Sequence, residues 1–569
     1  MSVLGYVTDS SQASAYGWLE KHMRNGLLPG RKHRLARVAV VGLMLVATAA
    51  CGDDDGDGDG GSGGTLTMAT WSSTVSLDPI QVAGTGNSSG AELAALYDTI
   101  MRYDLESGTF VPHIAESLTA NDDFTEWTLV LREGVTFSDG SPYDSAAVVA
   151  NLQRHVEARS NASSLLSPIS GYDTPDDRTV VFTLAFPWNN FPFVLAAAPG
   201  MVVNPAAVAA QGENLGTNPV DAGAGPFILE SFRPGESVTL VRNPNYWGGE
   251  VPLDELRFIH AGDGPQTYEA FRAGNVDVAF LRDAAAIADA DADGASGIRV
   301  PYSANDTLIM NNGLPIVCQG GEPAPRCADQ PDGTRLESES PTADKRVRQA
   351  VAAAIDLETL GQRVYSGAAA MSSALISPES RWYDGIEGPS YDPDLARRLV
   401  DEAKADGWDG RIRVSCHTGL PTWGTAVAGM LEAVGFEVEV NDQQEIAANT
   451  AAVIVRKDYD IACFGSSISD AEPFFALNRD FNSSYVETGG GNFSGYVNPE
   501  VDEAIARGRA AASEDEVRAA ISAIARAYSE DVPFLALTSQ PEVVLVSDSV
   551  SGLLTSVNTV VLFSQASVR

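Results

Sequence analysis

A tract of Asp, Gly and Ser residues at positions 53–64 divides the chain into a short leader and a long segment that can fold. The tract, DDDGDGDGGSGG, contains no side chain able to bury apolar surface, so we expect it to stay solvated and to act as a disordered linker. Beyond it roughly 500 residues remain, which is more than one hydrophobic core usually organises. The sequence therefore predicts two or three domains after Gly64.

The leader has the layout of a bacterial export signal. Basic residues precede an apolar run at 38–50, which has the length of a signal-peptide core and is too short for a membrane-spanning helix. Small residues stand directly before Cys51, and this border resembles the lipobox, whose cysteine is acylated and becomes the mature N-terminus. We predict a signal peptide at 1–50, with Met23 favoured as the true start, and a diacylglycerol-type lipid on Cys51. The alternative is a free cysteine after an ordinary secretion signal.

The acidic tract also contains part of a calcium-binding pattern. Asp55, Asp57 and Asp59 have the spacing of the first ligands of an EF-hand loop. The twelfth position of such a loop is Leu66 instead of Glu, and no helical pattern flanks it. We therefore interpret 51–64 as a lipidated cysteine followed by a linker, and we expect no metal site there.

The charge of the chain excludes some classes of partner. With 37 Lys and Arg against 76 Asp and Glu, the formal net charge is −39 at pH 7. Nucleic acid and anionic lipid both repel such a chain, so we expect no nucleic-acid partner and membrane attachment through the lipid alone. No second long apolar run occurs. The expected location is extracytoplasmic, on the outer face of the cell membrane or in the periplasm.

Four cysteines lie beyond the leader, in a compartment where disulfides persist. Cys318 and Cys327 enclose a loop rich in Gly and Pro and can close a short ring. Cys416 and Cys463 lie in two strand-like segments, where they either pair or remain buried thiols. Four cysteines allow three pairings, and the sequence leaves the choice open.

Beyond Gly64 the hydrophobic pattern alternates between strands and helices, without the period of a repeat protein. Alternating apolar residues predict a strand around Leu129. Capping signals predict helices that begin after Asp392 and after Ser513. An apolar stripe from Val347 to Leu360 predicts another helix. The mixture indicates an α/β protein with at least two lobes.

The sequence contains no pattern typical of an enzyme active site. Its six histidines are scattered and form neither a zinc-protease motif nor a Cys/His metal spacing. No nucleophile elbow, Walker loop or dinucleotide fingerprint occurs. We therefore predict a protein that binds without catalysis and uses no cofactor.

Seven blocks of sequence occur in an order that resembles one protein family. The blocks are TMATWSSTVSLDPI, LYDTIMRYD, WTLVLREGVTFSDGSPYDSAAVV, GAGPFILESFRPGESVTLVRNPNYWGG, DKRVRQAVAAAID, YDPDLARRLVDEA and FSGYVNPEVDEAI. Together they are similar to the peptide- and nickel-type extracellular solute-binding proteins of bacterial ABC importers, solute-binding family 5. The resemblance implies an α/β fold of two hinged lobes, like the type II periplasmic binding proteins, with an extra subdomain in the first lobe.

The resemblance also implies domain boundaries. The first lobe would take 65–305 together with a return at 532–569, and the second lobe would take 306–531. The two crossings between the lobes would lie near 305–312 and 532–538.

The function that the resemblance implies is solute capture for import. A monomeric receptor would hold a short peptide or a similar small solute between its lobes and deliver it to a permease driven by separate ATPase subunits. A nickel chelate, an opine and an oligosaccharide are the alternative solutes. Outside transport, the alternative is a sensory or adhesive lipoprotein.

The solute contacts expected from the resemblance centre on one acidic segment. Peptide-binding relatives carry a pattern like A-D-x-x-[DE]-P, whose first acid pairs with the free amine of the peptide. In FGSSISDAEPFF the position four before Pro473 is Ser469, and Asp470 follows it. Either Asp470 reaches the amine, or the contact is missing and one of the two residues caps the next helix. Aromatic side chains are also typical of cleft walls. The aromatic candidates, each of which could instead belong to the core, are Trp71, Tyr97, Trp423 and Phe464.

Overall fold

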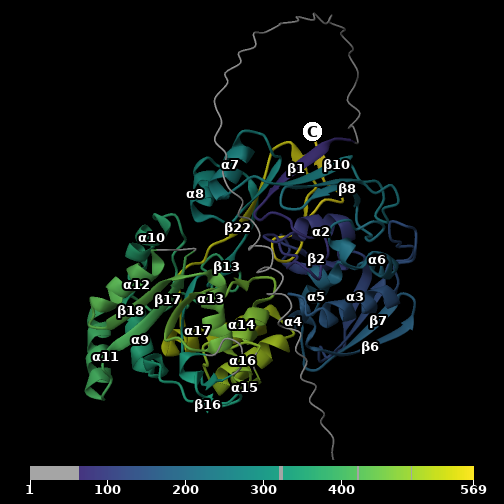
Figure 1. The fold of residues 1–569 in the computed structure, drawn as a ribbon. Coiled ribbons are helices and arrows are strands. Elements are labelled where there is room, and N and C mark those ends of the chain that lie inside the picture. The colour runs from purple at the N-terminus through teal and green to yellow at the C-terminus, as the bar shows by residue number, and fades with distance from the viewer. Residues whose placement is uncertain (1–62, 319–323, 419–421, 489) are drawn as a thin grey trace, which may run out of the picture. The chain divides into compact units, whose positions relative to one another are not determined.

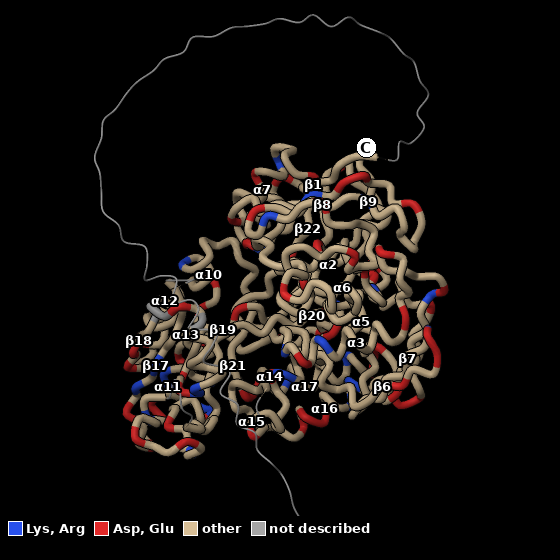
Figure 2. The backbone as a smooth tube through the Cα atoms, turned by 45° about the vertical axis from the view of Figure 1, so that its right-hand side comes forward, with Lys and Arg blue, Asp and Glu red and all other residues tan. Residues whose placement is uncertain are grey.

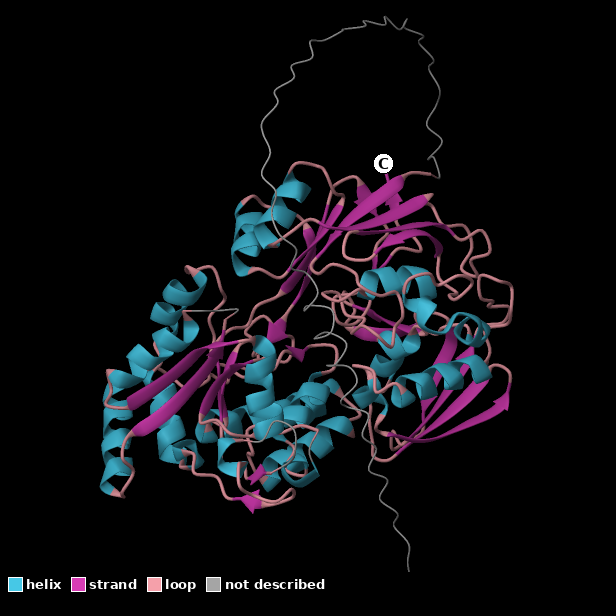
Figure 3. Ribbon diagram, viewed as in Figure 1, coloured by secondary structure: helices cyan, strands magenta, loops and turns pink. Residues whose placement is uncertain are grey.

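The computed structural model describes residues 63–318, 324–418, 422–488 and 490–569, all of which belong to a unit that begins at Gly61. The predicted signal peptide, the start at Met23 and the predicted lipid site Cys51 lie outside the described residues. Helices and strands alternate along the described chain, as the hydrophobic pattern predicts (Figure 3). In the described residues, no helix combines the length and the apolar character needed to cross a bilayer.

A seven-stranded sheet forms the centre of the first lobe, in the order β12-β22-β11-β1-β10-β9-β8. Its strands are β1 (Thr65–Thr70), β8 (Phe227–Arg233), β9 (Ser237–Arg242), β10 (Glu255–His260), β11 (Val278–Leu281), β12 (Gly297–Val300) and β22 (Glu542–Val546). β1 runs parallel to β10 and β11, whereas β22 is antiparallel to β11 and β12. Because β22 comes from the C-terminal part of the chain, the first lobe is built from two separate segments.

Helices and short strands complete the first lobe. α7 (Gly264–Arg272) and α8 (Ala284–Ala292) pack their apolar residues on β1, β11 and β22 (Figure 1). The other helices and short strands are α2 (Gly90–Tyr97), β2 (Met101–Asp104), β3 (Thr109–Pro112), α4 (Ser163–Leu166), α5 (Pro192–Ala196), α6 (Pro205–Gln211), β23 (Val550–Ser551), β24 (Leu554–Thr555), β25 (Val561–Leu562) and β26 (Ser567–Val568). The last of these strands lie in the core beneath the seven-stranded sheet, so the C-terminus stabilises this lobe.

A second, smaller sheet gives the first lobe a subdomain with its own core. The sheet has the order β4-β5-β7-β6 and is antiparallel throughout. Its strands, with the helix that covers them, are β4 (Ala115–Ala120), β5 (Glu126–Leu131), β6 (Ile169–Asp176), β7 (Thr179–Leu184) and α3 (Ser145–Glu157). Trp127, Leu129 and Leu131 of β5 are all buried, which confirms the strand predicted from their alternation.

A five-stranded sheet forms the centre of the second lobe, in the order β18-β17-β19-β14-β21. Its strands are β14 (Thr307–Met310), β17 (Arg411–His417), β18 (Glu437–Gln444), β19 (Ile461–Phe464) and β21 (Phe534–Ala536). The surrounding helices are α9 (Lys345–Ala354), α10 (Leu357–Tyr365), α11 (Pro393–Ala405), α12 (Trp423–Glu432), α13 (Ile446–Ala451), α14 (Pro473–Phe481), α15 (Tyr485–Thr488), α16 (Pro499–Arg509) and α17 (Glu514–Asp531). Short strand pairs are β13 (Tyr302–Ser303) with β20 (Ile468–Ser469), and β15 (Ile316–Val317) with β16 (Arg335–Leu336).

Two segments connect the sheets of the two lobes. Residues 301–306 lead from β12 to β14, and residues 537–541 lead from β21 to β22. The predicted crossings overlap these segments, but each predicted range also contains a strand of the second lobe, β14 or β21. Since β21 is hydrogen-bonded to β14, the second lobe extends past the boundary predicted at 531. The segment around β21 is apolar throughout, and its sequence does not indicate which of two sheets takes it.

Side-chain caps fix the beginnings of the predicted helices. The Asp392 carboxylate accepts from the backbone N of Leu395 at 2.9 Å, and α11 follows as predicted. Ser513 caps α17 by accepting from the backbone N of Glu516 at 3.4 Å. The single helix predicted from Val347 to Leu360 is wrong, because the chain is extended at its centre and Asp356 starts a second helix, α10.

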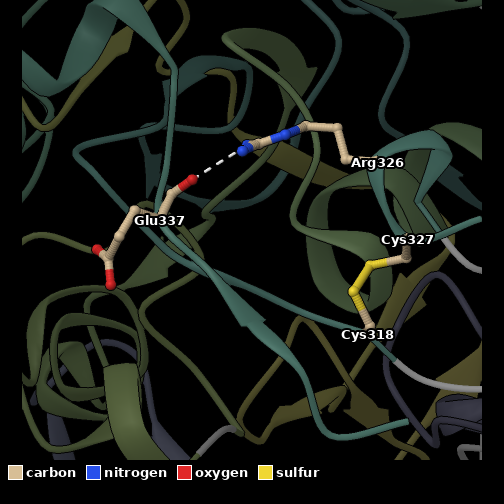
Figure 4. The surroundings of a disulfide bond; sticks show 4 residues. All are labelled: Cys318, Arg326, Cys327 and Glu337. Carbon is tan, nitrogen blue, oxygen red and sulfur yellow. Dashed lines mark hydrogen bonds between the residues drawn. A yellow bond between two sulfur atoms is a disulfide. The ribbon is translucent and has the colours of Figure 1, made fainter. Parts of the chain in front are cut away.

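Both pairs of cysteines in the second lobe form disulfides. Cys318 and Cys327 close the Gly/Pro-rich loop, where neighbouring Arg326 donates to the carbonyl of Glu337 at 3.0 Å (Figure 4). Cys416 and Cys463 join the adjacent parallel strands β17 and β19. Of the three pairings that the sequence left open, the structure therefore has the one with a disulfide inside a loop and a disulfide between neighbouring strands.

Candidate functional site

A cavity of about 300 Å³ lies between the two lobes, beside the first connecting segment. Its first-lobe wall combines apolar side chains with a charged pair at the edge of the central sheet, and consists mainly of Ala83, Asn87, Ala162, Leu165, Phe193, Ala197, Ala198, Arg282 and Glu542. Its second-lobe wall comes from the segment between β19 and α14 and from α14 itself, and consists of Ser466, Ser467, Ser469, Glu472, Phe475, Ala476 and Arg479. The fold thus encloses one cavity with segments that are distant in sequence.

Direct contacts hold the two lobes together around this cavity. The backbone N of Asn189 in the first lobe donates to the carbonyl of Arg509 in the second at 2.8 Å. Arg381 of the second lobe donates to the carbonyl of Gly108 in the first at 2.7 Å. The rings of Phe193 and Phe475 stack across the interface with centroids 6.4 Å apart. Two further cavities, of about 320 and 360 Å³, lie along the same interface.

Glu472 lines all three interlobe cavities and is 2% exposed. Asn190, from the other lobe, donates to its Oε2. Its Oε1 has no hydrogen-bond partner among the described residues. Burial raises the pKa of Glu472 to about 7, against the opposing effects of Asn190, the Trp188 indole and the positive charge of Arg509. The cavity therefore contains one carboxyl group whose hydrogen bonding is incomplete.

Glu542 is a second buried carboxyl group in the cavity wall, and its hydrogen bonding is complete. Thr559 donates to one carboxylate oxygen at 2.6 Å, and Asn87 donates to the other at 3.3 Å. Arg282 lies 3.5 Å from the same oxygen as Asn87. Burial raises the pKa of Glu542, and these partners oppose the rise. Glu542 is thus satisfied without a solute.

Two neighbouring residues of the acidic segment predicted to contact a solute line different cavities. Ser469 lines the 300 Å³ cavity, whereas Asp470 lines the 320 Å³ cavity. The Asp470 carboxylate accepts from the Ser380 hydroxyl at 2.5 Å and from the backbone N of Arg381 at 3.1 Å. Burial raises the pKa of Asp470. The alternative role as a helix cap is wrong for both residues, because Glu472 occupies the N-cap position of α14.

Two of the four aromatic candidates belong to the core instead. Tyr97 is fully buried, and its hydroxyl donates to the carbonyl of Leu77 at 2.8 Å. Trp423 is 1% exposed inside the second-lobe core. Both predictions are wrong, because these side chains expose no surface that a solute in the cavity could reach.

The other two aromatic candidates are half-buried. Trp71 packs against the first-lobe core, and it is not part of the wall of the 300 Å³ cavity. Phe464 lines a space of only about 20 Å³, beside Phe493. The aromatic side chains in the wall of the 300 Å³ cavity are instead Phe193, Phe475 and Tyr302.

A larger groove of about 670 Å³ lies wholly within the second lobe. Figure 2 shows acidic and basic residues distributed over both lobes. Residues of both kinds line this groove. Its arginines pair with carboxylates, as in Arg413 with Asp460 at 3.0 Å and Arg326 with Glu339 at 2.8 Å. Since its guanidinium groups are already paired, the groove offers a solute less than the interlobe cavity does. Within the described part of the chain, no cluster of three or more His, Cys, Asp or Glu could hold a metal ion.

Glu472 is the residue that the sequence interpretation missed. The sequence interpretation singled out Ser469 and Asp470, whereas the acid with an unpartnered oxygen, Glu472, directly precedes Pro473. The available signal was the second acid of the pattern A-D-x-x-[DE]-P, which this chain retains at Glu472. Asn190, which holds Glu472 from the other lobe, lies 282 residues away in sequence and has no such signal.

Comparison with known proteins identifies one family. The sequence profile described as "Bacterial extracellular solute-binding proteins, family 5 Middle" matches residues 109–487. Protein XP55 of Streptomyces lividans is 28% identical over 469 residues, which cover 78% of this chain and 79% of that protein. The glutathione-binding protein GsiB of Salmonella typhimurium is 26% identical over 340 residues, which cover 59% of this chain and 60% of that protein.

Solved structures agree with this result at the level of the fold. The oligopeptide-binding protein AppA from Bacillus subtilis, in complex with a nonapeptide, matches 90% of this chain and 99% of its own with a TM-score of 0.66. The sequence identity in this match is 17%, so the likeness establishes the fold alone. It confirms the predicted α/β architecture of two hinged lobes.

Proposed function

The chain belongs to the bacterial extracellular solute-binding proteins of family 5, the binding components of ABC importers, and from this premise we propose that it captures a short peptide or a similar small solute in the interlobe cavity. The supporting observation is a cavity of about 300 Å³ between two lobes that only two chain segments connect. This volume is at the lower end of the range of ligand pockets, which suits a small solute.

The arrangement supports a receptor that closes over its solute. Two connecting segments act as a hinge, and the lobes can separate without unfolding either sheet. A solute that contacts both walls binds the closed form better than the open form, and so shifts the population towards closure. A permease that docks on the closed form would then receive loaded receptors.

The experiment that tests this proposal combines native mass spectrometry with small-angle scattering. Protein purified without refolding is expected to carry a bound small molecule in part of its population. Removal of that molecule should increase the radius of gyration, and its return should restore the smaller value. If no copurified molecule and none of a broad panel of peptides and other nutrients alters the scattering curve, the proposal fails.

A solute other than a peptide is the second candidate, and one observation favours it. The residue four positions before Pro473, where the resemblance places the acid for a peptide amine, is the neutral Ser469. Asp470, one position later, already accepts two hydrogen bonds from its own lobe. If Asp470 nevertheless pairs with a free amine, Asp470→Ala should weaken peptide affinity more than tenfold. Unchanged affinity would favour the non-peptide solute.

We also propose that the protein is a monomer tethered outside the cell by lipid on Cys51. The lipobox-like border and the linker at 53–64 support this anchor. Acyl chains on one cysteine provide the two or more hydrophobic signals that firm anchoring requires. Cys51→Ala, expressed in a bacterial host that processes lipoproteins, should move the protein from the membrane fraction to the soluble fraction. A variant that stays membrane-bound would contradict the anchor.

A further inference from the structure

A short segment of the extra subdomain, residues 186–190 after β7, contacts the second lobe. Trp188 in this segment is 4% exposed, and the next aromatic residue, Phe191, is fully buried in the subdomain core. Their rings pack edge to face with centroids 6.0 Å apart. Because these two side chains anchor the segment on both sides, Asn189 and Asn190 are held in place, and both donate hydrogen bonds to the second lobe.

Asn189 supplies hydrogen-bond donors to the C-terminal end of α16. Its backbone N donates to the carbonyl of Arg509 at 2.8 Å. Its side-chain Nδ2 donates to the carbonyl of Gly508 at 3.3 Å and to that of Ala511 at 2.8 Å. The last carbonyls of a helix have no partner within the helix and must find donors elsewhere. Asn189 therefore caps a helix of the second lobe from the first lobe.

Arg509 adds a second contact at the same place. Its guanidinium lies 3.6 Å from the centre of the Phe186 ring, which is close enough for a cation–π interaction between the lobes. Phe186, Asn189 and Arg509 are all half-buried, so water can solvate their polar groups when the lobes separate. Polar contacts of this kind between domains allow relative motion, whereas a large apolar interface does not. These contacts can therefore form and break without unfolding either lobe.

On the basis of the proposed function, we propose that residues 186–190 and the C-terminal end of α16 form a clasp that holds the lobes closed and releases when they separate. The clasp gives the extra subdomain a role in solute capture. Phe186, Asn189 and Arg509 are not part of the wall of the cavity of about 300 Å³ in which we place the solute. Since the clasp and the solute favour the same closed form, weakening the clasp should weaken the binding of different solutes by one common factor.

Hydrogen exchange of the wild type without solute tests the clasp without a mutation. The backbone N–H of Asn189 is bonded to a carbonyl of the other lobe, so it should exchange whenever the lobes separate. The N–H of Leu129, in the interior strand β5 of the same subdomain, should exchange only when the subdomain unfolds. Separation of the lobes exposes far less surface than unfolding does. The protection of Asn189 should therefore be lower than that of Leu129 and should change little in dilute urea.

Asn189→Asp breaks the clasp with the smallest change of shape. It replaces the donor Nδ2 by a carboxylate oxygen that faces the carbonyls of Gly508 and Ala511, and it keeps the backbone N–H. We expect the protection factor at residue 189 to fall by about tenfold, the effect of losing one or two ordinary hydrogen bonds. The radius of gyration of the solute-free protein should increase, because the open form gains population.

The matched control is Asn121→Asp, which makes the same substitution and adds the same charge in the same subdomain. Asn121 is exposed in the turn between β4 and β5, where its Nδ2 donates to the Thr125 hydroxyl at 3.1 Å. This variant should leave both the protection at residue 189 and the radius of gyration unchanged. A loss of protection in both variants would assign the effect to added charge and would overturn the clasp.

Titration of both variants and the wild type with tri-alanine, tri-lysine and tri-glutamate links the clasp to binding. Each peptide that binds the wild type should bind Asn189→Asp more weakly by the same factor. Asn189 also borders the cavity of about 320 Å³, so factors that differ between peptides would show contact with the solute and overturn a role in closure alone.

The exchange measurements separate this inference from the function on which it rests. If the N–H of Asn189 exchanges only together with that of Leu129, the lobes do not separate at this place and the clasp is overturned, whatever the protein binds. Unchanged protection and an unchanged radius of gyration in Asn189→Asp would overturn it as well. A panel in which no peptide or other nutrient binds counts against the proposed function, and the exchange result still decides the clasp.

Discussion

Two buried glutamates line the interlobe cavity, one from each lobe, and their neighbours make them different. Glu542 of the first lobe is 5% exposed and has partners on both carboxylate oxygens, namely Thr559, Asn87 and Arg282. Glu472 of the second lobe is 2% exposed and has an unpartnered Oε1. Burial raises the pKa of both groups. The comparison shows that residue type and burial do not decide whether both oxygens of a buried acid have a partner; the donors around it do.

The largest expected difference between these acids appears in the pH dependence of stability. The pKa of Glu472 rises from the ordinary 4.5 to about 7 on folding, so between these values the folded state holds a proton that the unfolded state has lost. Raising the pH through this window therefore destabilises the folded protein, by about 3 kcal/mol in total. Glu472→Gln removes this contribution.

Urea denaturation of the wild type and of Glu472→Gln from pH 4 to pH 8 measures this effect. The difference in free energy of unfolding should favour the variant increasingly as the pH rises, and should level off above pH 7. Parallel curves for the two proteins would show that folding leaves the pKa of this carboxyl group unchanged, because its surroundings compensate the cost of burying its charge.

A smaller effect is expected from the hydrogen bond that joins Glu472 to the first lobe. Asn190 donates to Oε2 of Glu472 and to the carbonyl of Ala471, so Asn190→Ala removes both of these hydrogen bonds between the lobes. Hydrogen bonds to charged groups contribute about 2 kcal/mol, and we expect a loss of this size above pH 7. The loss should shrink at pH 5, where the carboxyl group is protonated in the folded state. A loss that is independent of pH would assign the effect to the Ala471 carbonyl alone.

Local features of this fold were predictable from sequence because short-range physics determines them. The alternation around Leu129 produced a strand, and the side chains of Asp392 and Ser513 cap their helices as expected. The failure at Asp356 is also local, because a residue able to cap a helix can interrupt an apolar stripe. The hydrophobic pattern alone predicted only an α/β protein with at least two lobes. The seven ordered blocks, through their resemblance to a family, predicted the specific architecture.

The site was less predictable because it depends on contacts between distant segments. Tyr97 and Trp423 are aromatic, as residues of a cleft wall often are, yet Tyr97 packs in the first-lobe core and Trp423 in the second-lobe core. Whether Asp470 or Glu472 keeps a free oxygen depends on Ser380 and Asn190, which belong to segments far away in the chain. A sequence shows the acids, but it does not show which donors the fold brings to them.

The smallest expected effect comes from the matched change beside Glu542. Asn87→Ala removes one donor from its carboxylate, as Asn190→Ala does from Glu472, but Thr559 and Arg282 still partner both oxygens. We therefore expect a loss of about 1 kcal/mol, the contribution of an ordinary hydrogen bond, with no additional penalty for an unsatisfied charge. Urea denaturation at pH 8 measures it beside Asn190→Ala. If Asn87→Ala proves as costly as Asn190→Ala, then Arg282, whose side chain is 40% exposed, contributes little to Glu542. The two glutamates would then differ in the number of their partners without differing in how far those partners compensate their charge.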